Sequence, residues 1–205
     1  MNSTFHAHDL LWGMPSAQLP EDAPDWARQV LDAGLPVVVR RASGEAGLVP
    51  VGVRGDQRAR RLGAWMTATQ VSCRLRPEDL RLQDPADLPA LVALQQVTPI
   101  LDDLGLAWGP TGGVGYQLAT GLTVLHAGSD LDLLLRTPTR FSRAEARSLS
   151  HRLKGLACRI DLQLETPNGA VALAEWATDS ARVLLKHRDG ARLVADPWHL
   201  AEQPA

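Results

Sequence analysis

Two aspartates close together in the sequence have the spacing of a metal-binding pair. Asp130 and Asp132 lie two residues apart in the segment GSDLDLLLR (128–136). On a strand both side chains would point to one face, because the side-chain period of a strand is two. Two adjacent carboxylates repel each other, and Mg²⁺ is a hard cation that prefers such oxygen ligands. We therefore expect Mg²⁺, with Mn²⁺ as the alternative, on Asp130 and Asp132. A pair of exposed aspartates at a strand start is the simpler alternative.

A third carboxylate belongs to a later segment with strict alternation. Asp161 lies in RIDLQLET (159–166), with Gln163 and Glu165 on the same face. If this strand neighbours 131–136, Asp161 lies beside the aspartate pair. There it could share a metal ion or accept a proton from an attacking hydroxyl. The alternative is a solvated polar face on an amphipathic strand.

A glycine-rich segment, WGPTGGVG (108–115), precedes the aspartates. Glycines allow backbone N–H groups to approach phosphate oxygens closely, so Gly112 and Gly113 are candidate phosphate contacts. The segment lacks the Gly-Lys-Ser/Thr ending of a Walker loop and does not fit the dinucleotide fingerprint. A plain turn is the simpler interpretation.

The elements that must position these residues form an α+β pattern. In the N-terminal part we expect a helix at 21–34 and strands at 35–42, 48–55 and 64–75, with Pro50 near a sheet edge or at a strand start. The stretch 76–89 is charged, contains three prolines and is the best linker candidate. This predicts a small α+β N-terminal domain over residues 1–80.

The C-terminal part, residues 85–205, is predicted to be a mixed sheet with flanking helices. Apolar residues from 88 to 106 have helical spacing, interrupted by Pro99, which indicates two helices or one kinked helix. Further elements are a strand at 131–136, a helix at 142–157 with Ser142 and Glu145 as a capping box, a strand at 159–166, a short helix at 169–177 and a hairpin at 182–198 with Asp189-Gly190 as its turn.

Composition limits the class of protein. The 205 residues are 45% hydrophobic and 21% charged, with a net charge of -2. This lacks the basic excess of a nonspecific nucleic-acid binder, so no nucleic-acid partner is expected. No apolar run reaches the roughly 18 residues of a membrane span, and no signal peptide is recognisable. Two cysteines, expected to be buried free thiols, complete the profile of a cytoplasmic protein.

A Gly-Gly turn, an Asp-x-Asp strand and a later single aspartate together resemble the nucleotidyltransferase superfamily. The matching positions are Gly112-Gly113, Asp130 with Asp132, and Asp161. Sixteen residues separate Gly113 from Asp130, more than is typical of this superfamily. Either this loop is an insertion or Gly128-Ser129 supplies part of the phosphate contact.

Longer motifs resemble a particular family, the phosphoribosyl-dephospho-CoA transferases of malonate decarboxylase, which are holo-acyl-carrier-protein synthases. The motifs cover nearly the whole chain: HDLLW (8–12), VVVRRA (37–42), VGVRG (51–55), GLAWGPTGGVGYQLATG (105–121), SDLDLLLR (129–136), DLQLETPNGAVALAEWA (161–177), VLLK (183–186) and DPW (196–198).

The resemblance implies transfer of the phosphoribosyl-dephospho-CoA group from triphosphoribosyl-dephospho-CoA to a serine of the apo acyl-carrier subunit, with release of pyrophosphate. Cations must then assist the departing pyrophosphate. The candidates are Arg136, Lys186, Arg54 and Arg58, of which Lys186 is preferred because it ends an apolar strand. Two alternatives are a small nucleotidyltransferase with another acceptor and a non-catalytic nucleotide-binding assembly module.

Overall fold

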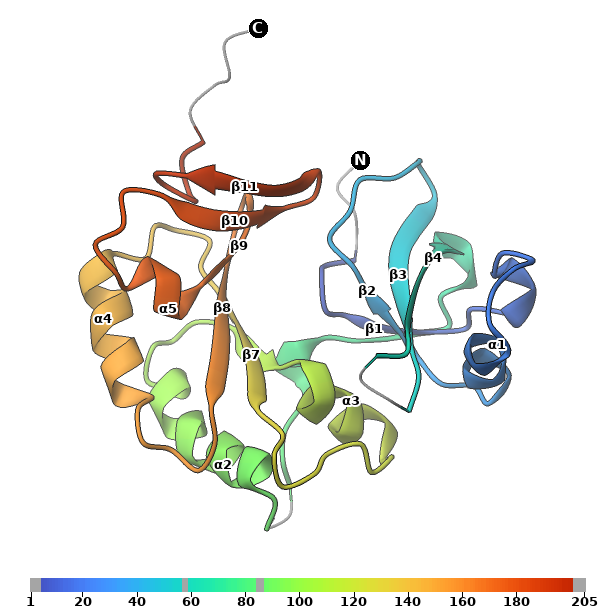
Figure 1. Ribbon diagram of the computed structural model, residues 1–205, viewed down its shortest axis with the longest axis horizontal. Helices are drawn as coiled ribbons and strands as arrows, with labels where there is room; N and C mark the ends of the chain where they lie inside the picture. Colours follow the sequence, from blue (N-terminus) through green and yellow to red (C-terminus); the bar gives the residue numbers. More distant parts are fainter. Residues whose placement is uncertain (1–4, 57–58, 84–86, 201–205) are drawn as a thin grey trace, which may run out of the picture. The chain divides into compact units, whose positions relative to one another are not determined.

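The computed structural model describes residues 5–56, 59–83 and 87–200. The chain divides into two compact units, residues 1–79 and 80–205 (Figure 1). Each unit combines a β-sheet with helices, so the expected α+β class is confirmed.

The first unit is a five-stranded antiparallel sheet in the order β4-β3-β2-β1-β5. Alternate residues of its strands, among them Val37, Val51 and Met66, pack with Ala27 and Leu31 of the helix to form one core. The elements are β1 (Leu10–Trp12), α1 (Asp25–Asp32), β2 (Val37–Val39), β3 (Leu48–Arg54), β4 (Arg61–Thr67) and β5 (Cys73–Leu75), with 3-10 helices at Ser16–Gln18, Ala68–Gln70 and Pro77–Asp79.

Two predictions for this unit were wrong. The expected strand at 64–75 is two strands, because a 3-10 turn at Ala68–Gln70 separates β4 from β5, which lie at opposite edges of the sheet. Pro50 does not lie at an edge or at a strand start, since it is the third residue of β3, between β2 and β4. Its carbonyl accepts from the N–H of Arg40, just beyond the end of β2. The proline nitrogen faces that same side, where no ladder bond is required of it.

The second unit is a six-stranded mixed sheet in the order β11-β10-β9-β8-β7-β6, in which β7 and β8 are parallel and the other pairs are antiparallel. The crossover between the parallel strands is a helix, α4. The elements are α2 (Pro89–Asp102), β6 (Trp108–Pro110), α3 (Gly112–Thr120), β7 (Leu131–Arg136), α4 (Arg143–Arg152), β8 (Ile160–Thr166), β9 (Gly169–Ala172), α5 (Leu173–Trp176), β10 (Val183–His187) and β11 (Gly190–Val194).

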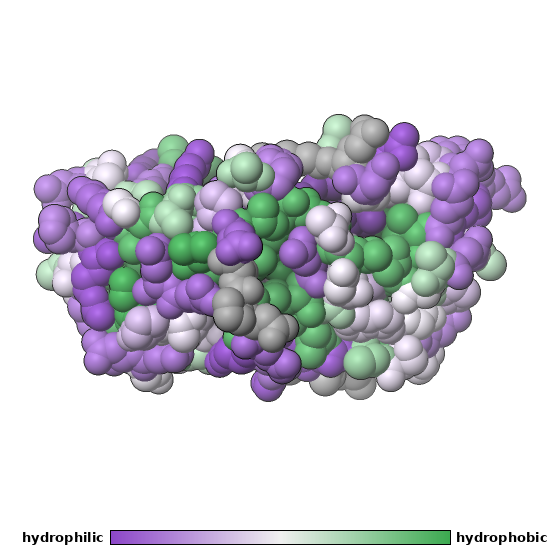
Figure 2. Space-filling model, turned by 90° about the horizontal axis from the view of Figure 1, so that it is seen from below, coloured by the Kyte–Doolittle hydropathy of each residue, from purple (hydrophilic) through white to green (hydrophobic). Residues whose placement is uncertain are grey.

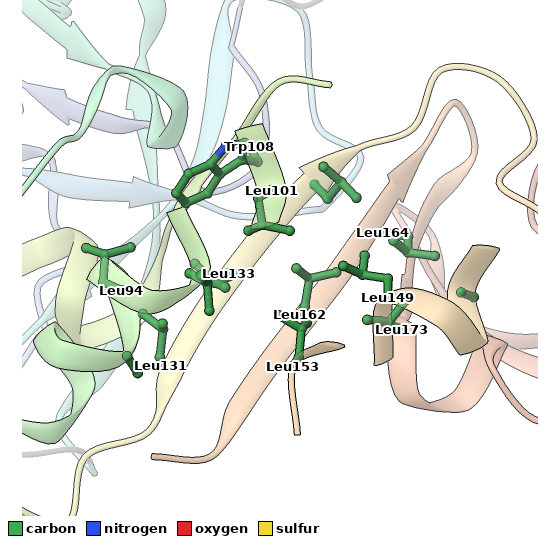
Figure 3. Close-up of a cluster of buried hydrophobic side chains, with 14 of the residues drawn as sticks. Leu94, Leu101, Trp108, Leu131, Leu133, Leu149, Leu153, Leu162, Leu164 and Leu173 are labelled. Carbon is green, nitrogen blue, oxygen red and sulfur yellow. The ribbon is translucent and has the colours of Figure 1, made fainter. Parts of the chain in front are cut away.

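Leucines build the core of this unit. Leu131 and Leu133 of β7 and Leu162 and Leu164 of β8 are all buried on one face. Figure 3 shows them together with leucines contributed by the helices. These are Leu94 and Leu101 from α2, Leu149 and Leu153 from α4 and its end, and Leu173 from α5. The alternation of each strand therefore sends its polar residues to the other face of the sheet.

The structure confirms the strands at 131–136 and 159–166, the hairpin and the capping box at Ser142. The turn of the hairpin lies one residue earlier than expected, because His187 pairs with Gly190. The segment 88–106 contains one helix, α2, with Pro99 inside it.

Two other assignments in this unit were wrong. The segment 169–177, predicted as a short helix, is a strand followed by a single helical turn. The sequence did not reveal the strand, because β9 is buried along most of its length and so lacks the alternation of polar and apolar residues that marks a half-buried strand. The glycine-rich segment 108–115 is a strand, β6, and the beginning of α3 rather than a simple turn.

The surface seen from below has apolar patches among its hydrophilic side chains (Figure 2). Within the described residues, no helix is both long enough and apolar enough to cross a membrane.

Candidate active site

Asp132 and Asp161 are direct neighbours across two parallel strands. Their Cα atoms are paired in the register of β7 and β8, so the two side chains leave the same face of the sheet on strands about 4.8 Å apart. Both residues are partly exposed. Leu131 and Leu133, on either side of Asp132, are fixed in the core, which prevents the strand from turning its carboxylate inward. The predicted proximity of Asp161 to Asp132 is thus a feature of the fold.

Asp130 immediately precedes β7 and is also partly exposed. Burial raises the pKa of the nearby Cys158 thiol, and the negative charge of Asp130 raises it further. Cys158 lies just before β8, so the charge of Asp130 acts at the same end of the strand pair as Asp132 and Asp161. Asp130, Asp132 and Asp161 therefore all lie at the end of the sheet where β7 and β8 begin.

The start of α3 lies against the Asp132 carboxylate. A Cβ atom at position 112 would collide with the carboxylate of Asp132, and Gly112 has a φ of 57°. Both observations require glycine here. The N–H of Thr111 donates to the Asp132 carbonyl over 2.9 Å, which ties the end of β6 to β7. The glycine pair predicted as a phosphate contact therefore begins a helix, whose first N–H groups have no partner within the helix.

The sixteen residues between Gly113 and Asp130 are mostly α3 and a loop tied to it. Gln117 of α3 accepts hydrogen bonds from the backbone N–H groups of Val124 and Leu125 at 3.0 and 3.1 Å. The hydroxyl oxygen of Ser129 accepts from the N–H of His126 over 3.0 Å. Ser129 is thereby held in a turn next to Asp130, and its hydroxyl hydrogen remains available to a ligand.

A cavity of about 330 Å³ reaches Asp161. It lies between the end of α4, the start of α5 and the start of β8, beside the face of the sheet that these helices cover, because Leu153, Leu162 and Leu173 also line it. Its lining includes Lys154 and Arg159. Both are exposed, and neither side chain forms an ion pair with another residue in the described part of the chain. Sequence reasoning missed these two cations. The sequence feature that could have indicated them is the basic segment HRLKGLACR (151–159), which directly precedes the strand that carries Asp161.

The two cations favoured by the sequence lie farther along the same face. Arg136 is paired with Glu165, four residues beyond Asp161. Glu165 is paired with Ala170, which is paired with Lys186 on β10. Lys186 is exposed and lies three strand spacings from β7, about 14 Å across the sheet. The structure thus places both on the carboxylate face and brings neither next to Asp132. Of the N-terminal candidates, Arg54 ends β3 in the first unit, and Arg58 lies outside the described residues.

Like charges on paired positions of neighbouring strands repel each other, and a cation relieves that repulsion. Among the described residues no group of three or more His, Cys, Asp or Glu side chains is arranged to hold a metal ion. Two neighbouring carboxylates nevertheless fit Mg²⁺, which usually takes one or two carboxylates and completes its shell with water and substrate phosphates. The site has the donors for an ion shared with a phosphorylated substrate.

A mixed sheet that displays carboxylates beside a glycine-initiated helix suits an enzyme acting on phosphate groups. Two family models cover almost the whole chain: the phosphoribosyl-dephospho-CoA transferase MdcG N-terminal domain matches residues 6–77 and the C-terminal domain matches residues 74–197. The chain therefore belongs to the phosphoribosyl-dephospho-CoA transferase MdcG family, and it is a transferase. The resemblance inferred from the sequence motifs is confirmed.

Curated relatives carry the same description. A phosphoribosyl-dephospho-CoA transferase of Pseudomonas putida is 62% identical over 96% of both chains. Proteins of that name from Pseudomonas fluorescens (strain Pf0-1) and Azotobacter vinelandii are 54% and 55% identical, over 100% and 93% of both chains. No solved structure matches the chain.

Proposed function

We propose that this chain transfers the phosphoribosyl-dephospho-CoA group from triphosphoribosyl-dephospho-CoA to a serine of the apo acyl-carrier subunit of malonate decarboxylase. The observation that carries the proposal is the juxtaposition of Asp132, Asp161 and Gly112 in a member of this transferase family. Both cysteines are free, although Cys73 is exposed and Cys158 only partly buried, so the expected burial was wrong. Free thiols suit a reducing compartment, and we place the reaction in the cytoplasm.

The reaction exchanges one phosphorus–oxygen bond for another. The serine oxygen attacks the phosphorus of the donor triphosphate that is attached to the ribose. The bond from that phosphorus to pyrophosphate breaks, and the serine becomes a phosphodiester. The serine proton must leave during the attack, and the partly exposed carboxylate of Asp161, beside Asp132, would accept it.

Asp130 and Asp132 would hold Mg²⁺, or Mn²⁺ as the alternative. When bound, the ion would neutralise charge on the phosphate oxygens in the transition state. The backbone N–H groups of Gly112 and Gly113 and the hydroxyl of Ser129 would contact the same phosphates.

Pyrophosphate leaves with a high negative charge and needs nearby cations. Arg159 lies two residues before Asp161, so strand alternation places it on the carboxylate face, and we assign it this role. Lys154, just beyond the end of α4, lines the same cavity as Arg159 and is the second candidate. Arg136 and Lys186 lie farther along the carboxylate face. We assign these two to more distant parts of the donor, which is a long molecule.

The test is incubation of the protein with apo acyl-carrier protein, triphosphoribosyl-dephospho-CoA and Mg²⁺, followed by intact mass of the carrier. The expected result is a mass increase equal to one phosphoribosyl-dephospho-CoA group, which disappears with a chelator and returns when Mg²⁺ is added in excess. A carrier of unchanged mass would reject this acceptor. A mass increase that is insensitive to the chelator would reject the metal.

A further inference from the structure

The first unit contains a pocket of its own, which the proposed chemistry does not use. Its volume is about 440 Å³, within the range typical of small-molecule sites. It lies over the sheet where β2, β3 and β4 meet the segment before β1. Its lining includes His8, Arg40, Arg41 and Arg61, and none of the described residues that line it is acidic.

Two glycines make room for one of these arginines. Gly52 of β3 and Gly63 of β4 are paired directly across the two strands. A Cβ at position 63 would collide with the guanidinium of Arg40, and a Cβ at position 52 would lie 3.4 Å from its Cδ. The side chain of Arg40 therefore packs directly on the backbone of Gly52 and Gly63, and a side chain at position 63 would displace it.

The charge of Arg40 has no partner among the described residues. Its guanidinium makes no hydrogen bond or ion pair with any residue in the described ranges. Arg41 and Arg61 line the same pocket and have interactions of their own. An anion in the pocket would pair with Arg40, since a guanidinium fork matches phosphate oxygens two at a time.

His8 reaches the pocket from a strained turn. It has a φ of 75°, which is uncommon for a residue with a Cβ and costs about 1–3 kcal/mol. The turn is fixed on both sides. The N–H of His8 donates to the Val39 carbonyl over 2.9 Å. The fully buried Asp9 accepts from the N–H of His6 over 2.8 Å and pairs with Arg74 at 2.8 Å. The fold thus holds His8 in an unfavourable conformation at the pocket.

We propose that this pocket binds the diphosphate of a dephospho-CoA group, so that the first unit is a donor-binding unit of the transferase. Three arginines favour a polyanion over a single carboxylate, and the concave shape favours a small molecule over the surface of an acidic protein. The proposal rests on the proposed function for the identity of the ligand. The chemistry that it requires, a diphosphate on clustered guanidinium groups, is independent of turnover.

The test is calorimetric titration of the full chain with dephospho-CoA and, separately, with inorganic pyrophosphate. Arg40→Gln is expected to weaken the binding of both by about tenfold, the loss typical of a hydrogen bond to a charged group. Gly63→Ala keeps every charge but displaces Arg40, and a similar loss is expected.

The matched control is Arg60→Gln, which removes the same charge from the same unit. Arg60 is exposed, pairs with Asp56 at 3.1 Å and does not line the pocket. Affinity is expected to stay within twofold of the wild type. Equal losses in Arg40→Gln and Arg60→Gln, or no loss in Arg40→Gln, would overturn the proposal.

A third measurement separates the pocket from carrier docking and from the transfer reaction. If Arg40→Gln raises the KM for the apo carrier and leaves the affinity for dephospho-CoA unchanged, the pocket receives the carrier and the proposal fails. If dephospho-CoA binding depends on Arg40 but the wild type does not modify the carrier, the pocket stands and the proposed function fails.

Discussion

The pairing of Asp132 with Asp161 is the feature on which the chemistry depends at the scale of single residues. Asparagine has nearly the shape of aspartate but lacks the charge that holds a divalent cation. We expect Asp132→Asn to lower carrier modification by at least about 10³-fold, a loss of about 4 kcal/mol of transition-state stabilisation. The melting temperature without ligand should stay within a few degrees of the wild type. Wild type should gain thermal stability from Mg²⁺ with donor, and the variant should lose most of that gain.

Asp161→Asn is the informative companion variant, because its proposed role concerns the serine proton. It should keep most of the thermal gain from Mg²⁺ and donor while losing turnover. If Asp132→Asn modifies the carrier at the wild-type rate, the catalytic carboxylates lie elsewhere.

Gly112 provides a second test at this scale. Alanine at this position would take up a left-handed conformation and collide with the Asp132 carboxylate. We expect Gly112→Ala to cost about 1–2 kcal/mol of stability and to lower turnover by about 10²-fold through displacement of the carboxylate. The measurements are urea unfolding and the carrier-modification rate.

Gly121, at the other end of the same helix, is a matched control. Its φ is 73°, and no atom lies within 4 Å of a Cβ built there. Gly121→Ala should cost a similar amount of stability and leave turnover unchanged. Equal losses of turnover in both variants would show that the contact with Asp132 is not what matters.

The cations can be ranked by their distance from the carboxylates. Lys154 lines a cavity whose lining also includes Asp161, whereas Lys186 lies three strands from β7. We expect Lys154→Ala to raise the donor KM by about tenfold and Lys186→Ala by about two- to threefold, as for an exposed charge. Steady-state kinetics with both variants measures this. A larger effect of Lys186 would reverse the ranking, and no effect of Lys186 would remove it from the site.

At the scale of elements, the sequence predicts what local pattern controls. The leucine alternation of 131–136 and 159–166 identifies two strands and the face on which each aspartate lies. The register that places Asp132 beside Asp161 is not predictable in this way, because it depends on the crossover through α4 and on packing of the whole core. The helix α3 could not be predicted from the local sequence either. Its glycines disfavour a helix locally, and burial of Val114 and Tyr116 compensates.

The capping box of α4 makes a quantitative prediction for that helix. The N–H of Ser142 donates to Glu145 over 2.6 Å, and the N–H of Glu145 donates to the Ser142 hydroxyl over 3.2 Å. Ser142→Ala should cost about 1 kcal/mol, measured by urea unfolding at pH 7. Arg147 lies on the same helix and forms an exposed ion pair with Asp179, which lies outside the helix. Arg147→Gln removes this pair and should cost less than about 0.5 kcal/mol.

The same cap should depend on pH. Side-chain and backbone hydrogen bonds from Ser142 lower the pKa of Glu145 below its ordinary value of 4.5. A carboxyl group with a lowered pKa in the folded state contributes stability above its unfolded pKa, and this contribution is lost as the pH falls through the folded value. The difference between wild type and Glu145→Gln should therefore be largest near neutral pH and shrink below pH 4.5. A difference that stays constant down to pH 3 would contradict the assignment.

At the scale of the whole molecule, the described residues form two hydrophobic cores. One is built only from residues of the first unit, including Val51 and Met66, and the other only from residues of the second, including Leu133 and Leu164. The proposed chemistry and the proposed diphosphate pocket divide in the same way. The carboxylates belong to the second unit, and the arginine pocket belongs to the first.

Separate cores predict that a cavity made in one unit loosens that unit first. Met66 and Leu133 are both almost completely buried, and replacement of either by alanine should cost about 2–5 kcal/mol. Met66→Ala should accelerate amide hydrogen exchange in β2, β3 and β4 and leave β7 and β8 protected, because the lost contacts all lie in its own core. Leu133→Ala should do the reverse and should also lower carrier modification, since Leu133 fixes the strand that carries Asp132. Exchange measured by mass spectrometry on peptides from both units distinguishes the outcomes. Equal acceleration in both units from either substitution would mean that the two cores unfold as one cooperative structure.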